Sequence, residues 1–125
     1  MIRFALLGCG RIAKRHADLL GQGVIRGARL VAVCDSDRSR AAAFGERYGV
    51  PAHESMDELF ARGDVDVVSI LTPSGLHADH SVRASAASKH VVVEKPMALT
   101  LADADRMIAA ADAAGRRIFV VKQNR

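Results

Sequence analysis

Short apolar runs alternate with longer amphipathic stretches along the whole chain. Runs rich in Val, Ile and Leu at residues 3–7, 30–34, 65–71, 90–93 and 118–121 predict strands, and the turn segment 49–52 adds a short one. The run 65–71 is almost continuous, which is typical of a strand buried on both faces. The stretches 11–21, 37–48, 56–63, 77–88 and 102–114 predict helices, the first of which has Ile12, Leu19 and Leu20 on one side.

Capping and breaking residues separate these elements. Ser36 or Asp37 can cap the second helix, and the segment 55–58 has the form of a capping box, with Ser55 at the cap and Glu58 three residues on. Six strands with helices between them, joined by right-handed crossovers, predict an α/β fold: a doubly wound parallel six-stranded sheet of the Rossmann type. We expect one domain over residues 1–125.

The composition agrees with such a sheet. Half of the 125 residues are hydrophobic, aromatic residues make up only 4%, and there is no Trp. The core must therefore be built from Ala, Val, Leu and Ile, as expected where helices pack closely on a parallel sheet.

Charge and cysteine content limit the possible partners. The net charge of +4 suits an anionic ligand or nucleic acid, or is only a mildly basic surface. No basic run is interleaved with aromatic residues, so we expect no nucleic-acid partner. Cys9 and Cys34 lack metal-ligand spacing, so we expect no metal and two reduced thiols. The N-terminus resembles neither a signal peptide nor a membrane span, which favours a cytoplasmic protein with no membrane partner.

The first motif with chemistry is Gly8-Cys9-Gly10-Arg11-Ile12-Ala13, between a strand and a helix. Gly8 allows a tight turn, Gly10 allows the backbone to approach a pyrophosphate, and Ala13 allows close packing of helix on strand. The free N–H groups and dipole of the helix favour the phosphate charge. The alternative is an ordinary strand-to-helix turn that serves another ligand.

Asp35 ends the second strand, 22 residues after Ala13. A carboxylate there can accept hydrogen bonds from both hydroxyls of an adenine ribose and would repel a 2′-phosphate, which favours NAD over NADP. Asp35 can instead be a helix cap, and Arg38 is close enough to pair with a 2′-phosphate.

Three further segments follow strand ends, where ligands of open α/β sheets bind. The segment 72–77 contains His77, which can instead be a helix-start residue that contacts solvent or backbone. The Glu94-Lys95-Pro96 segment places a lysine where it can take a proton from a hydroxyl that loses hydride, although the segment also reads as a surface turn. The last four residues, 122–125, all carry hydrogen-bonding side chains, which could contact a cofactor amide or an anionic substrate. The alternative is that they form a solvated terminus.

These motifs together resemble the Gfo/Idh/MocA oxidoreductase family over the whole chain, in order and at the expected spacing. Glu94-Lys95-Pro96 is the most specific element. Within the family, residues 11–16 and 122–125 look most like dehydrogenases that oxidise C3 of a UDP-linked N-acetylglucosaminuronic acid for bacterial surface polysaccharides.

The resemblance implies roles position by position. Lys95 is implied as the catalytic or substrate-orienting residue, and a sugar or nucleotide sugar as the substrate. Further substrate contacts are implied for Lys122, Asn124 and Arg125. NAD contacts are implied for Gly8, Gly10, Arg11, Ile12, Asp35, Leu71, Thr72, Ser74, His77, Glu94 and Gln123.

The resemblance also implies a second domain that this chain lacks. Family enzymes continue into a C-terminal α+β domain, which carries a second acid/base and forms the oligomer contact. We therefore expect a fragment that is inactive alone and a full-length homo-oligomer. Two alternatives stay open: a dinucleotide sensor without catalysis, for which Lys95 would have no use, and a dehydrogenase of another sugar or of inositol. A Rossmann-like methyltransferase would fit Asp35 but not the glycine loop or Glu94-Lys95-Pro96.

Overall fold

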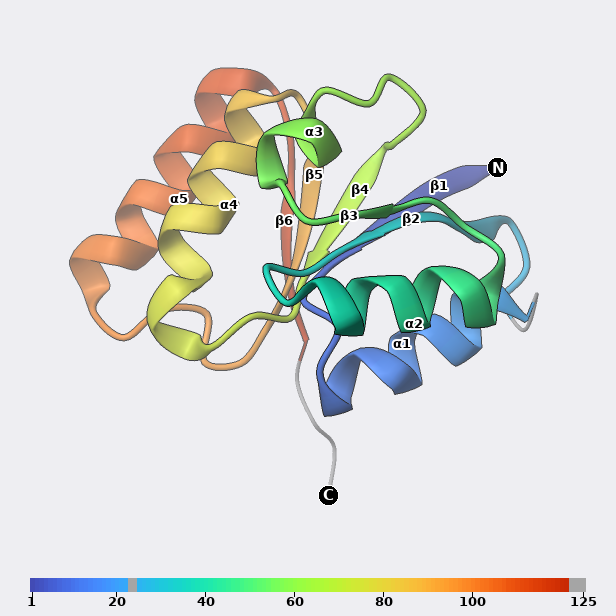
Figure 1. Ribbon diagram of the computed structural model, residues 1–125. Coiled ribbons are helices and arrows are strands. Elements are labelled where there is room, and N and C mark those ends of the chain that lie inside the picture. The colour runs from blue at the N-terminus through green and yellow to red at the C-terminus, as the bar shows by residue number, and fades with distance from the viewer. Residues whose placement is uncertain (23–24, 122–125) are drawn as a thin grey trace.

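The computed structural model describes residues 1–22 and 25–121. Its centre is one six-stranded sheet in the order β3-β2-β1-β4-β5-β6, in which all the strand pairs are parallel. The predicted doubly wound Rossmann sheet is therefore confirmed (Figure 1). The strands are β1 (Ile2–Leu7), β2 (Ala28–Cys34), β3 (Ala52–His53), β4 (Val67–Ile70), β5 (His90–Glu94) and β6 (Ile118–Val121).

Helices follow the strands as the sequence predicts. The α-helices are α1 (Arg11–Gly21), α2 (Arg38–Tyr48), α3 (Met56–Phe60), α4 (His77–Ala86) and α5 (Leu101–Ala114), and the short 3₁₀ helix η1 spans Ser74–Leu76. Asp37 caps α2 by accepting hydrogen bonds from Ser39 N and Arg40 N. The Ser55 hydroxyl accepts from Glu58 N at 3.4 Å, which is the forward half of the expected capping box.

The helices cover the sheet in two layers (Figure 1). One core lies between the sheet and α3, α4 and α5, with Leu59 and Met107 both fully buried. The other lies under α1 and α2, where Ala13 and Ala17 have no exposed surface and let α1 approach the sheet closely. This sandwich leaves the loops at the carboxyl ends of the strands along one edge.

The boundaries differ from prediction in places. The strand predicted at 65–71 is shortened to Val67–Ile70, and the helix predicted at 77–88 ends at Ala86, because Ala87 and Ser88 form the turn into β5. The buried stripe of α1 is Ala13, Ala17 and Leu20. Leu19, which the sequence groups with Ile12 and Leu20 on one side of this helix, lies at the edge of that stripe, with 40% of its surface exposed.

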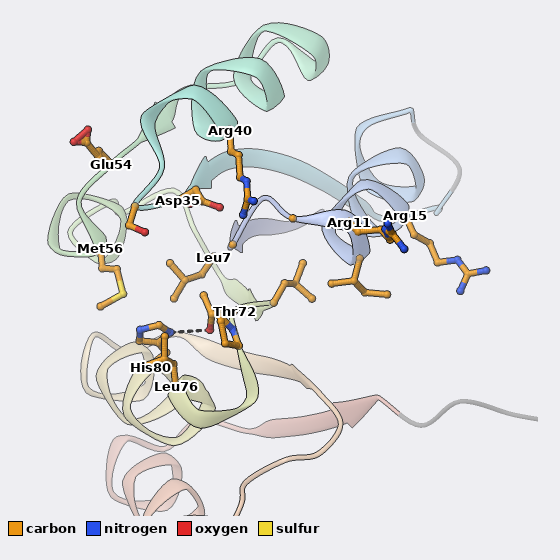
Figure 2. A pocket seen from close by; sticks show the side chains of 16 residues that line it. Leu7, Arg11, Arg15, Asp35, Arg40, Glu54, Met56, Thr72, Leu76 and His80 are labelled. Atoms are coloured by element: carbon orange, nitrogen blue, oxygen red, sulfur yellow. Dashed lines mark hydrogen bonds between the residues drawn. The ribbon is translucent and has the colours of Figure 1, made fainter.

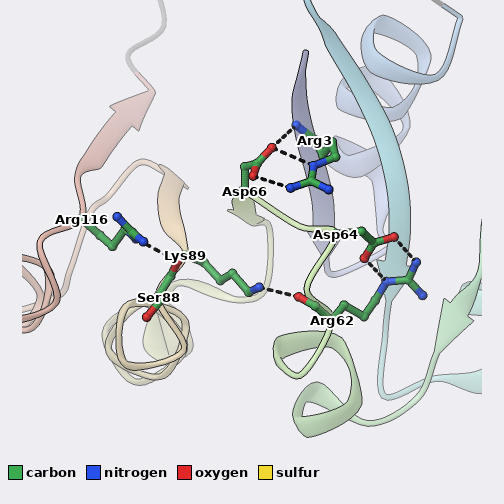
Figure 3. A network of polar contacts seen from close by, with 7 residues as sticks. All are labelled: Arg3, Arg62, Asp64, Asp66, Ser88, Lys89 and Arg116. Atoms are coloured by element: carbon green, nitrogen blue, oxygen red, sulfur yellow. Dashed lines mark hydrogen bonds and ion pairs between the residues drawn. The ribbon is translucent and has the colours of Figure 1, made fainter.

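Polar contacts link the segments at the amino ends of the strands, opposite the edge where the carboxyl ends lie (Figure 3). The Asp66 carboxylate accepts from Arg3 N at 2.8 Å, from Nε at 3.1 Å and from Nη2 at 3.0 Å. The Lys89 ammonium is buried and donates to the Arg62 carbonyl at 2.5 Å. The Arg3 guanidinium and backbone N–H lower the pKa of Asp66 from 3.8 to about 2.

Replacing Asp66 by Asn should lower the free energy of unfolding by about 1–2 kcal/mol at neutral pH, because charge-assisted bonds to Arg3 weaken and solvent screens the pair. The lowered pKa means that this stability is present above the ordinary pKa and is lost as pH falls from about 4 toward 2. Urea titrations across this range measure it. A gap between the two proteins that is undiminished at pH 2 would contradict the assignment. Asp79→Asn, at the more exposed pair with Arg106, is the control and should lower stability less than Asp66→Asn does.

Candidate cofactor site

The loop between β1 and α1 needs glycine at its first position. Gly8 has φ +105°, and its N–H donates to the Cys34 carbonyl at 2.8 Å. A Cβ at Gly8 would lie 2.9 Å from the carbonyl carbon and oxygen of Leu71, at the end of β4. Both backbone conformation and space therefore exclude other residues. A Cβ at Gly10 would meet nothing within 4 Å, so Gly10 faces an open cradle that the protein itself does not fill.

The N-terminus of α1 is open to an anion. Gly10 caps the helix without a side-chain hydrogen bond, and the first turn contains no acidic residue. The first backbone N–H groups of a helix lack partners within it, and the helix dipole is positive at this end. The loop therefore has the chemistry of a phosphate cradle, and phosphate binding by it stays a prediction.

The carboxylate of Asp35 lies beside this loop at the end of β2. Its Oδ2 accepts from Cys9 N at 2.7 Å, and its Oδ1 accepts from Asp37 N at 2.7 Å. Asp35 thus supports the loop and the start of α2 rather than capping α2, which Asp37 does. Each carboxylate oxygen has a further lone pair, so the fixed group can still accept from ligand hydroxyls.

These groups line one cleft of about 820 Å³, a volume suited to a nucleotide-sized ligand (Figure 2). It lies over the carboxyl ends of β1, β2, β3 and β4. The lining residues are Leu7, Gly8, Gly10, Arg11, Ile12, Arg15, Asp35, Ser36, Arg40, Glu54, Met56, Leu71, Thr72, Pro73, Leu76 and His80.

Three arginines and two carboxylates surround the cleft. Arg40 extends from α2 toward the glycine loop beside Asp35, and Arg11 and Arg15 stand on α1 (Figure 2). Arg38 does not line the cleft, because its Nε donates to Glu54 Oε2 at 3.2 Å and its side chain is 87% exposed. The basic group beside Asp35 is therefore Arg40 rather than Arg38.

The loop after β4 forms the opposite wall. The hydroxyl of Thr72 contacts His80 Nδ1 at 2.8 Å, and both residues line the cleft (Figure 2). Burial lowers the pKa of His80, which favours its neutral form. His77 is buried behind this wall, with Nδ1 2.8 Å from the Pro96 carbonyl and Nε2 2.8 Å from the Thr72 carbonyl. His77 therefore starts α4 and contacts the backbone, which was the alternative interpretation of this residue. Its direct contact with a cofactor stays a prediction.

The Glu94-Lys95-Pro96 segment lies at the end of β5, beyond the residues that line the cleft. Glu94 Oε1 lies 2.9 Å from His16 Nε2 on α1, and the Lys95 side chain is exposed. Ser74 begins η1 and does not line the cleft. The other predicted site residues, Lys122, Gln123, Asn124 and Arg125, lie outside the described residues.

Outside the predicted glycine loop and segment 72–77, sequence reasoning assigned no site role to seven residues that line the cleft. They are Leu7, Arg15, Ser36, Arg40, Glu54, Met56 and His80. One signal was available for two of them: Glu54 and Met56 lie within three residues of the end of β3, whose carboxyl end must share an edge with those of β1 and β2.

The thiols of the two cysteines stay protonated at neutral pH. Burial raises the pKa of the Cys9 thiol to about 12 and that of Cys34 to about 11. Among the described residues, no three His, Cys, Asp or Glu side chains gather as a metal site would require. No helix in that part of the chain is both long and apolar enough to cross a membrane.

A parallel sheet with a glycine loop at the N-terminus of α1 and a carboxylate at the end of β2 defines a dinucleotide-binding domain of the Rossmann class. Residues 2–122 match the GFO_IDH_MocA family, described as an oxidoreductase family with an NAD-binding Rossmann fold. The chain belongs to this family, and the resemblance inferred from the sequence is confirmed.

Solved structures and curated proteins give the same relationship. The WlbA dehydrogenase from Bordetella pertussis, solved with NADH and UDP-GlcNAcA, is 44% identical, with a TM-score of 0.92 over 99% of this chain and 38% of that one. KijD10, a 3-ketoreductase from Actinomadura kijaniata solved with NADP, is 34% identical, with a TM-score of 0.87 over 95% and 38% of the two chains. Inositol 2-dehydrogenase from Salmonella typhimurium is 36% identical over 96% of this chain and 36% of its own. The chain thus spans about a third of the length of its curated relatives.

Proposed function

We propose that residues 1–125 are the dinucleotide-binding domain of an NAD-dependent dehydrogenase that oxidises a secondary hydroxyl of a nucleotide sugar. The observation that carries the proposal is the cleft, in which the cradle at Gly10 and the fixed carboxylate of Asp35 lie together. The pyrophosphate would lie on the N-terminus of α1, and the ribose hydroxyls would donate to Asp35.

The chemical step transfers a hydride from the carbinol carbon to bound NAD, while the hydroxyl proton goes to a base. Lys95 is the group of this chain that we assign to that proton or to the developing negative oxygen. Its position after β5 supports the assignment, because β5 lies on the side of β1 away from the Asp35 half of the cleft. A partner base would come from the rest of the protein.

The proposed substrate is a UDP-linked N-acetyl-hexuronic acid, which is oxidised at C3. The 44% identity to a dehydrogenase solved with NADH and UDP-GlcNAcA supports it. Lys122, Asn124 and Arg125 are our proposed contacts to the sugar acid, and Gln123 to the cofactor. A cytoplasmic location is supported by the free thiols of Cys9 and Cys34, and we also propose a homo-oligomer.

A polyol such as inositol is the second candidate, favoured by the 36% identity to inositol 2-dehydrogenase. The two differ in charge, because the nucleotide sugar carries a pyrophosphate and a carboxylate and inositol carries neither. NADH formation by the full-length protein with each substrate separates them.

Isothermal calorimetry of the full-length protein with NAD and with NADP tests the cofactor. We expect NAD to bind at least roughly tenfold tighter, because the Asp35 charge repels a 2′-phosphate. Asp35→Asn, which keeps the size but removes the charge, should narrow this preference. A preference for NADP in the unsubstituted protein would contradict the proposal and point to Arg40, which lines the same cleft.

A further inference from the structure

The second nucleotide of a dinucleotide must lie over β4 and β5. The cleft residues that follow β2 and β3, such as Ser36 and Met56, line the half of the cleft on the β3 side of β1. The glycine loop lies between the two halves, after β1. With the adenine ribose at Asp35, the nicotinamide half therefore extends toward the end of β5, where Glu94 lies.

A contact between α1 and β5 occurs at this point. His16 Nε2 lies 2.9 Å from Glu94 Oε1, and the two residues are 78 positions apart in the sequence. With the carboxylate ionised, the imidazole N–H donates and the carboxylate oxygen accepts. His16 is on the same helix whose N-terminus forms the phosphate cradle, so one helix contacts both halves of the proposed cofactor site.

The surroundings make this contact stronger than a surface pair. The side chains of His16 and Glu94 are only 18% and 15% exposed. His16 also lines a small hollow of about 120 Å³ with Phe4, Ser69 and Val92. Charges in such a place are screened little by salt, and losing one partner leaves the other poorly solvated. Glu94 would therefore change position if the imidazole were removed.

We propose that His16 is a positioning residue, which acts through Glu94 on the nicotinamide half of the cofactor. By holding Oε1, it fixes the carboxylate and leaves Oε2 to accept from the cofactor, since Oε2 has no hydrogen-bond donor among the described residues. The inference rests on the proposed NAD-dependent function. It adds a residue of α1, outside the glycine loop, to the residues that determine cofactor affinity.

Two ligands separate this role from a general effect on α1. NADH carries the nicotinamide, whereas ADP-ribose has the same adenosine and pyrophosphate without it. In the full-length protein, His16→Ala should weaken NADH binding about tenfold and ADP-ribose binding less than twofold. His16→Gln, whose amide can donate to Glu94, should keep NADH affinity within about threefold of the unsubstituted protein.

Two more variants complete the experiment. Glu94→Gln should lose NADH affinity as His16→Ala does, and the double variant should lose no more than either, because the pair acts as a unit. His90→Gln, at the other end of β5, is the matched control and should leave both ligands unaffected.

Each other result decides against the inference. Unchanged NADH affinity in His16→Ala, or an equal loss for ADP-ribose, overturns the positioning role while the proposed function stands. Failure of the unsubstituted protein to bind either ligand overturns the proposed function, and this inference with it.

Discussion

Replacing Lys95 by Ala in the full-length protein should lower turnover by about 10³-fold and change NAD affinity less than about twofold. A positioned acid–base group contributes roughly 10²–10⁴ to the rate, which sets this magnitude. NAD affinity should change little, because the Lys95 side chain is exposed and does not line the cleft that holds the phosphate cradle and Asp35.

Steady-state kinetics with saturating NAD, together with calorimetry of NAD binding, measure the two quantities separately. Lys14→Ala is the matched control, since Lys14 is an exposed lysine that pairs with Asp18 on α1. Its turnover should stay near that of the unsubstituted protein. If Lys95→Ala also retained near-normal turnover, the proton would have to leave through another group, and the assignment of Lys95 would be wrong.

Replacing Gly10 by Val should reduce NAD affinity by about 100-fold or more, while lowering stability by only about 1 kcal/mol because Val is a poorer N-cap than Gly. The backbone of Gly10 has φ −86° and ψ −161°, which any residue can adopt, and the space around a Cβ is open. The valine methyl groups would then occupy the cradle where the pyrophosphate lies. Calorimetry with NAD and urea unfolding of the same protein measure affinity and stability.

Gly8 supplies the contrasting variant. Gly8→Ala should destabilise the fold by about 2–4 kcal/mol, because φ is +105° and the new Cβ would lie 2.9 Å from the backbone of Leu71. Two glycines of one motif, separated only by Cys9, thus serve different purposes: Gly8 is needed for the fold and Gly10 for ligand binding. Normal NAD binding by Gly10→Val would show that the cradle is not used.

Much of the fold could be predicted because its signals are local. The alternation of apolar runs and helical stretches, with caps at Asp37 and Ser55, depends on neighbouring residues only. The inward face of α1 was harder, since small alanines such as Ala13 and Ala17 are buried there while Leu19 is exposed. Hydrophobicity alone ranks leucine above alanine, whereas close packing on the sheet selects the smaller side chain.

The site was predictable only where a motif marks it. The glycine loop and Asp35 follow strand ends at fixed spacing, and the structure places both in one cleft. No sequence motif identifies His16, His80 or Arg40 as site residues. His16 meets Glu94 only through the folding of α1 against β5, and Arg40 rather than Arg38 faces the cleft because Arg38 pairs with Glu54. Contacts of this kind are set by tertiary structure.

The position of β1 in the middle of the sheet also bears on how the chain reaches this structure. β1 precedes the other five strands of the sheet in the sequence, yet it pairs with β2 on one side and with β4, which begins at Val67, on the other. Until β4 emerges from the ribosome, one edge of β1 has unpaired backbone groups and apolar side chains in water. Assembly of the sheet must therefore wait for more than half of these 125 residues, and a nascent chain halted earlier would be prone to aggregation.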